Sequence, residues 1–90
     1  MRVHVKLFSI LRECLPPGVA RSEATVEFPE GACLTDLIVH LGVDRRLGHP
    51  AQALSAVGWQ VLVNGQFELD MSRALVGGDH VQIFPPIAGG

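Results

Sequence analysis

One stretch decides how this 90-residue chain folds, and it reads LTDLIVHL, residues 34–41. Its apolar residues recur at i, i+3, i+4 and i+7 and so share one face of a helix: Leu34, Leu37, Ile38 and Leu41. Gly42 supplies the stop at the carboxyl end. Cys33 stands at the N-cap position and Asp36 lies three residues on. This predicts a weak capping box, because cysteine replaces the usual serine or threonine.

Segments of alternating polarity lie on both sides of this helix. We expect strands at residues 3–8, 24–28, 59–63, 67–69 and 80–84. Their inward-facing residues are Val3, Val5 and Leu7, then Val26 and Phe28, then Val61 and Val63, and last Val81 and Ile83. Asn64-Gly65 predicts a hairpin, since a type I′ turn needs positive φ at both central residues. The charge and shortness of segment 24–28 are typical of an edge strand.

The elements follow the order strand, strand, helix, strand, short strand, strand. This order predicts an α+β chain with a mixed sheet of four or five strands packed on one main helix. The first and last strands should pair in the middle of the sheet, which is the β-grasp, or ubiquitin-like, arrangement. We expect this domain to span residues 1–84 and an extended tail to span residues 85–90.

The connecting segments are less regular. Residues 9–15 predict a short helical turn that ends at Pro16-Pro17-Gly18. Residues 71–75 predict another brief turn of helix. Residues 43–58 show no clear pattern, although Pro50 could start a short helix that runs through Ala56.

Composition and charge narrow the classes of function. Hydrophobic residues make up 48% of the chain, which argues against disorder. The seven basic residues are scattered and the net charge is -2, so there is no footprint for nucleic acid. No apolar run approaches the ~20 residues of a membrane span, and the start of the chain lacks the apolar core of a signal peptide. We therefore expect a cytoplasmic protein that binds neither nucleic acid nor membrane.

The cysteines and histidines do not form a recognisable catalytic or metal-binding pattern. Two cysteines, Cys14 and Cys33, are too few for a disulfide scaffold, and we expect buried or half-buried thiols without a general base nearby. His4 and His80 should lie close together on neighbouring strands and the same outward face. Nothing supplies a third ligand there, so we expect no metal site.

The end of the chain breaks the pattern of the sheet. Pro85 and Pro86 cannot donate hydrogen bonds to a neighbouring strand, so the sheet must stop before them, and they keep the chain extended. The remaining residues are Ile87, Ala88, Gly89 and Gly90. Residues 85–90 can reach up to about 20 Å. Such a thin tail suits a carboxylate that enters a narrow channel in another protein, whereas the alternative is an ordinary frayed terminus.

Several stretches resemble a known family. They are Leu7-Phe8-Ser9-Ile10-Leu11-Arg12-Glu13, Val63-Asn64-Gly65, Gly77-Gly78-Asp79-His80-Val81 and Phe84-Pro85-Pro86-Ile87-Ala88-Gly89-Gly90. Together they resemble the small subunits of molybdopterin synthases, which are ubiquitin-like β-grasp sulfur carriers. The resemblance covers the chain except for about residues 43–58. The two prolines before the tail favour the molybdopterin branch over the thiamine carrier, but they are less decisive against a carrier for cysteine synthesis.

The resemblance implies that the working group is the C-terminal carboxylate of Gly90. A ubiquitin-activating-type enzyme would use ATP to adenylate it, and a sulfur donor of the cysteine desulfurase or rhodanese type would convert the adenylate into a thiocarboxylate. In complex with the large subunit of molybdopterin synthase, that sulfur would enter a pyranopterin precursor. The chain would then be a carrier and co-substrate without catalytic activity of its own, and it would bind no cofactor.

A partner-binding face is expected beside the tail. Phe8 and Phe84 take the outward phase of what should be adjacent central strands, and neighbouring exposed aromatic residues suggest a contact surface. Phe67 could join them, and Arg12 could form a polar rim. The resemblance matches these positions to the face that contacts the large subunit. In the alternative, another segment such as 43–58 covers the two aromatic residues.

Three other functions remain open at this point. The first is a sulfur carrier for another product, namely cysteine, thiamine or thiolated tRNA. The second is a ubiquitin-like modifier that is conjugated to lysines through Gly90. The third is a β-grasp interaction domain whose tail has no role.

Overall fold

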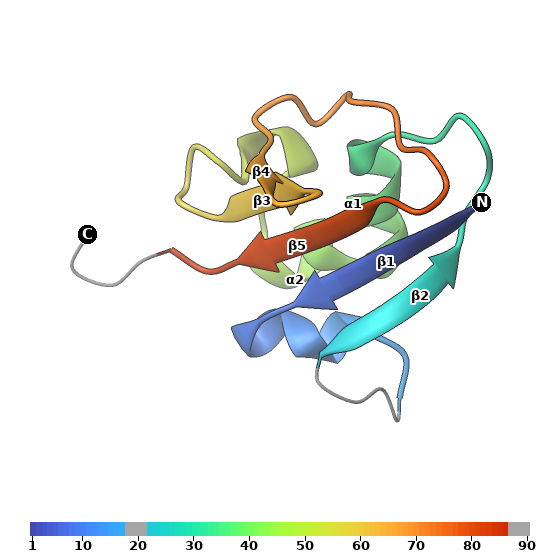
Figure 1. Cartoon of the computed structure of the whole chain (residues 1–90). Coiled ribbons are helices and arrows are strands. Elements are labelled where there is room, and N and C mark those ends of the chain that lie inside the picture. Colours follow the sequence, from blue (N-terminus) through green and yellow to red (C-terminus); the bar gives the residue numbers. More distant parts are fainter. Residues whose placement is uncertain (18–21, 87–90) are drawn as a thin grey trace.

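The computed structural model describes residues 1–17 and 22–86 of the chain. Its elements are β1 (Arg2–Leu7), η1 (Ser9–Cys14), β2 (Glu23–Glu27), α1 (Leu34–Leu41), α2 (Val43–Leu47), η2 (Ala51–Ala53), β3 (Gln60–Val63), β4 (Gln66–Phe67) and β5 (His80–Phe84). The five strands form one sheet in the order β2-β1-β5-β3-β4, and Figure 1 shows α1 and α2 together on one side of it. This arrangement confirms the predicted α+β, β-grasp architecture.

The centre of the sheet is the parallel pair of β1 and β5. Their register runs from His4 opposite His80 to Leu7 opposite Ile83. The other neighbours are antiparallel, with β2 beside β1 and β3 beside β5. The first and last strands therefore lie side by side, as predicted, and β2 is the predicted edge strand (Figure 1).

The core lies between the sheet and α1. All the inward-facing strand residues predicted from the alternation are buried except Val26, which is half-buried. On α1, Leu34, Leu37 and Ile38 have no exposed surface, and Leu41 packs partly against the same cluster. The apolar spacing of the helix therefore identified its buried face correctly.

Both ends of α1 are formed as the sequence predicts. Cys33 is the N-cap residue, and its backbone N–H donates to the Asp36 carboxylate at 2.9 Å. Gly42 follows the last turn in the left-handed region with φ of 80°, where glycine has no steric penalty.

Residues 71–75 do not form the predicted turn of helix. Their backbone carbonyls instead accept hydrogen bonds from α1: Leu34 N–H donates to Arg73 at 3.0 Å and Thr35 N–H donates to Met71 at 2.9 Å. The first N–H groups of a helix have no partner within it, and this segment satisfies two of them. Met71 and Leu75 are buried because they anchor this irregular segment to the core.

The remaining differences concern short elements. Residues 43–58 contain α2, which the sequence pattern did not reveal, and the helix predicted from Pro50 to Ala56 is only the three-residue η2. The strand expected at 67–69 is β4, two residues long. One further bond reaches β3, since Glu68 N–H donates to the Val61 carbonyl at 2.8 Å. The pairing then stops because Asp70 N–H donates to the Glu68 carboxylate instead of to β3. No helix in the described part of the chain is long and apolar enough to cross a membrane.

Candidate functional site

An aromatic pair lies where the two central strands end. The rings of Phe8 and Phe84 are stacked, with centroids 4.2 Å apart and planes 15° apart. The contact follows from the parallel register, because the residues after Leu7 and Ile83 continue it on the outward face. Both rings are half-buried, and the Lys6 ammonium lies 5.3 Å from the Phe8 centroid. The structure therefore brings together the two aromatic residues on which the predicted partner face depends.

Phe67 lies on the same side of the sheet but outside this stack. It pairs with Leu62 on β3, and the neighbour of Leu62 on β5 is Gln82. Phe67 on β4 is therefore two strands away from β5, at the register position of Gln82, which lies two residues before Phe84. Its side chain is 67% exposed. The register therefore places Phe67 on the outward face but outside the Phe8–Phe84 stack.

Arg12 is an exposed residue of η1, the element that follows Phe8. Its Nε donates to the Ser9 carbonyl at 3.3 Å. This bond leaves the guanidinium on the surface beside the start of the 3-10 helix. Its predicted place at the rim of the face stays a prediction.

Segment 43–58, which could have covered the aromatic pair, packs elsewhere. Its elements α2 and η2 contact α1, and Val43, Ala51 and Leu54 belong to the core cluster on the helix side of the sheet. The segment therefore completes the core.

The other end of the outward face is polar. His4 and His80 stack with centroids 4.5 Å apart, as predicted from their strands, and Thr25 Oγ1 lies 3.2 Å from His4 Nδ1. They border a shallow hollow of about 280 Å³ that reaches Lys6 and Glu23. Among residues 1–17 and 22–86, no three or more histidine, cysteine or acidic side chains gather in a way that could hold a metal ion.

The root of the tail is described as far as Pro86. β5 ends at Phe84, where the first proline interrupts the sheet, and Pro85 is half-buried while Pro86 is exposed. The predicted tail residues Ile87, Ala88, Gly89 and Gly90 lie outside the described residues, so their roles stay predictions. The structure nevertheless fixes where the tail starts: directly after the end of β5 (Figure 1).

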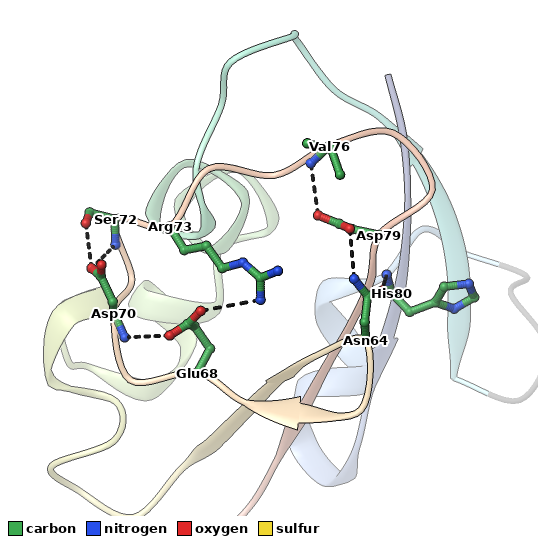
Figure 2. Close-up of polar contacts among 8 residues, drawn as sticks. All are labelled: Asn64, Glu68, Asp70, Ser72, Arg73, Val76, Asp79 and His80. Carbon is green, nitrogen blue, oxygen red and sulfur yellow. Dashed lines mark hydrogen bonds and ion pairs between the residues drawn. The ribbon is translucent and has the colours of Figure 1, made fainter.

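A polar network ties the β3–β4 hairpin to the start of β5. Asn64 and Gly65 both have positive φ, 53° and 82°, which confirms the predicted turn. Figure 2 shows Asn64 bonded to Asp79, whose other carboxylate oxygen accepts Val76 N–H at 2.9 Å. Burial tends to raise the pKa of Asp79, but these two hydrogen bonds, together with nearby basic side chains, lower that pKa overall. The sequence analysis identified the Asn64-Gly65 turn but missed its bond to Asp79.

The two cysteines are free, half-buried thiols, as predicted. Burial raises the pKa of Cys14, and the nearby Arg46 only partly opposes it. Because the thiolate is the reactive form, the raised pKa makes Cys14 a poor nucleophile.

Comparison with known proteins gives one family and several structures. The ThiS family matches residues 5–90. No curated protein sequence matches the chain. The putative molybdopterin converting factor subunit 1 from Pyrococcus furiosus is 27% identical, with a TM-score of 0.65, over 96% of this chain and 98% of that one. Small archaeal modifier protein 1 from Haloferax volcanii is 25% identical, with a TM-score of 0.64 and the same two coverages.

A further structure shares the fold alone. It is the complex of subunits 1 and 2 of the molybdopterin-converting factor from Helicobacter pylori, 19% identical, with a TM-score of 0.61 and full coverage of both chains.

Proposed function

Because this chain belongs to the ThiS family, whose matched region spans residues 5–90, we propose that it carries sulfur on its C-terminal glycine for molybdopterin synthesis. The coarser conclusion is that it is a small sulfur carrier or ubiquitin-like modifier with the β-grasp fold. The proposed role in molybdopterin synthesis rests on the position of the Phe8–Phe84 stack. It lies at the end of the strand from which the Gly-Gly tail leaves, so a partner bound there would receive the tail.

The reaction begins at the Gly90 carboxylate. Its pKa is near 3.5, so it is anionic at neutral pH and a poor electrophile. One of its oxygens attacks the α-phosphorus of ATP and pyrophosphate leaves, which gives an acyl-adenylate. ATP is bound and consumed by an activating enzyme of the ubiquitin-activating type, so this chain needs no cofactor.

Sulfur then replaces AMP. The terminal sulfur of a persulfide, formed on a cysteine desulfurase or rhodanese-type donor, attacks the acyl carbon and AMP leaves. The product is an acyl disulfide. A second thiol cleaves it, so that a new disulfide forms and the Gly90 thiocarboxylate is released. That thiocarboxylate is the nucleophile for the pyranopterin precursor.

The partners follow from this sequence of reactions. The large subunit of molybdopterin synthase would bind the face of Phe8 and Phe84, with Phe67 and Arg12 at its margin, and would supply the acids and bases for sulfur insertion. The complex of subunits 1 and 2 of the Helicobacter pylori factor supports this choice of partner through the shared fold. The chain is a co-substrate in this scheme, and we expect it to act in the cytoplasm.

A reconstitution tests the proposal. The chain is incubated with the activating enzyme, ATP and the sulfur donor, and its mass is measured; replacement of one oxygen by sulfur is the expected change. The product is then mixed with a large synthase subunit and the pyranopterin precursor, and dithiolene formation is followed. A chain that lacks Gly90 is the matched control. Absence of a thiocarboxylate on the intact chain would overturn the carrier function.

The 25% identity to small archaeal modifier protein 1 favours a second candidate, a modifier attached to lysines. It begins with the same adenylate, but a lysine amine would replace AMP instead of sulfur. Two results together would favour this candidate. Cells would contain covalent adducts of higher mass that depend on Gly90, and the reconstitution would form no dithiolene product.

A further inference from the structure

We infer that Gly58 is a positioning residue for the C-terminal tail, because its bare α-carbon is the surface against which the Pro86 ring packs. The contact itself is a property of the fold, whereas its role in sulfur transfer rests on the proposed function. Neither family resemblance nor the sequence pattern assigns a role to Gly58.

The register of the sheet places these two residues opposite each other. β3 and β5 are antiparallel, and their last pair is Gln60 opposite Phe84. Two residues further out on each chain are Gly58 and Pro86. Proline has no N–H to continue the ladder, so the chains meet here by packing. A Cβ built on Gly58 would lie 3.1 Å from Pro86 Cβ and 3.2 Å from Pro86 Cγ. A side chain at this position would therefore push the Pro86 ring away by a few tenths of an ångström, whereas glycine leaves the ring where it is.

Gly58 is itself held firmly. Its φ is +97°, a backbone conformation that favours glycine. Its N–H donates to the Ser55 carbonyl at 3.1 Å, and the next N–H, from Trp59, donates to Leu54 at 2.9 Å. The Leu54 side chain has no exposed surface. The backbone under Pro86 is therefore connected to the core by the hydrogen bond from Trp59 N–H to the buried residue Leu54. Segment 43–58 thus supports the start of the tail as well as completing the core.

The direction at Pro86 matters because four more residues follow it. When extended, they span up to about 14 Å. A rotation of ~10° at Pro86 would then move the end of the chain by about 2 Å, and displacements of ~1 Å can cost about a hundredfold in rate. A contact that fixes the direction of the chain at Pro86 therefore narrows the range of positions that the C-terminus takes relative to the channel of a partner.

The test compares two substitutions with similar backbone strain. Gly58→Ala adds a methyl group against Pro86, whereas Gly78→Ala adds one at φ of +91° with no atom within 4 Å. Both should lower the melting temperature by similar amounts. Thiocarboxylate formation with the activating enzyme, ATP and sulfur donor should fall roughly tenfold or more in kcat/KM for Gly58→Ala, and less than about twofold for Gly78→Ala. Equal losses in the two variants would overturn the inference.

A double substitution separates the contact from general strain. Pro86→Gly removes both ring atoms that the new methyl group would strike. In that background Gly58→Ala should cause little further loss, so the two changes should not be additive. Full additivity would show that Gly58 acts without Pro86 and would overturn the inference.

NMR of the free chain tests the contact without any sulfur chemistry. Nuclear Overhauser effects are expected between the Gly58 α-protons and the Pro86 ring, and they should disappear in Gly58→Ala while persisting in Gly78→Ala. Their absence from the wild-type chain would overturn the inference. If the wild-type chain shows them but gains no sulfur, the proposed function fails and the packing of Pro86 on Gly58 stands.

Discussion

Asn64 and Asp79 join two turns that are far apart in sequence, since Asn64 Nδ2 donates to Asp79 Oδ1 at 2.9 Å. Asn64 Oδ1 also accepts the His80 N–H at 2.9 Å, and the Asp79 carbonyl accepts His4 N–H at 2.8 Å. Asp79 is 5% exposed. The pair therefore fixes the start of β5 against both of its neighbours in the sheet, and β5 is the strand that leads to Pro85 and Pro86 (Figure 1).

Asp79→Ala should destabilise the fold. It removes the carboxylate that accepts hydrogen bonds from the Asn64 amide and from Val76 N–H, and a hydrogen bond to a charged group contributes about 1.5–3 kcal/mol. Urea unfolding measures the change. Asp70→Ala is the control, because Asp70 is exposed and its carboxylate accepts hydrogen bonds from Ser72, two residues away in the chain. A loss for Asp79→Ala no larger than that for Asp70→Ala would argue against the network.

Acid should weaken the fold through the same residue. Burial raises the pKa of Asp79, but its hydrogen bonds and nearby basic side chains together lower it in the folded chain. Its stabilising contribution is thus fully present above the unfolded value, about 3.9, and is lost as the pH falls through the lower folded value. The free energy of unfolding should fall below about pH 4, and Asp79→Asn should make this fall shallower. Urea titrations at several pH values measure it; identical slopes would rule Asp79 out as a source.

The longer helix and strands could be predicted from sequence because each has apolar residues at a regular spacing along the side that faces the core. Leu34, Leu37 and Ile38 mark α1 by their spacing, and the alternation of β1 and β5 marks both faces of the central strands. The Phe8–Phe84 contact was therefore accessible from the sequence, since it needs only the alternation and parallel pairing.

Other features depended on contacts that no local pattern contains. Met71 and Leu75 are spaced i, i+4 as in a helix, but the Met71 carbonyl accepts a bond from Thr35 of α1 and Leu75 N–H donates to Ala32, just before α1. α2 has five residues and only Val43 buried, too little for a period to appear. The contact between Gly58 and Pro86 depends on the path of segment 43–58, so its only local signal is an isolated glycine before a strand.

The core prediction concerns Leu37, which has no exposed surface. Leu37→Ala should cost about 2–5 kcal/mol through lost transfer free energy and a cavity. For a chain of this size, that can be most of its stability. Thermal unfolding measures the change, and an unchanged melting temperature would mean that the buried face of α1 is assigned wrongly.

The partner face can be tested at Phe84. Its ring is half-buried against Phe8 on the outward side of the sheet, so Phe84→Asp should leave the chain folded. Binding to the large synthase subunit should weaken by about 2 kcal/mol or more, as for an unpaired charge buried in an interface. Titration calorimetry measures it. Val39→Asp on α1, 41% exposed on the opposite layer, is the control. Unfolding of the Phe84 variant would make this residue part of the core instead.

The last prediction concerns the terminus. One alanine added after Gly90 should leave stability unchanged, if the tail makes no core contacts. The carboxylate then lies one residue, about 3.5 Å, beyond its place and carries a Cβ beside it. Because ~1 Å of displacement can cost about a hundredfold, adenylation should collapse and mass spectrometry should find no thiocarboxylate. Gly89→Ala should act more mildly, since it adds bulk and keeps the reach. Normal sulfur transfer by the extended chain, without trimming back to Gly90, would contradict the carrier function.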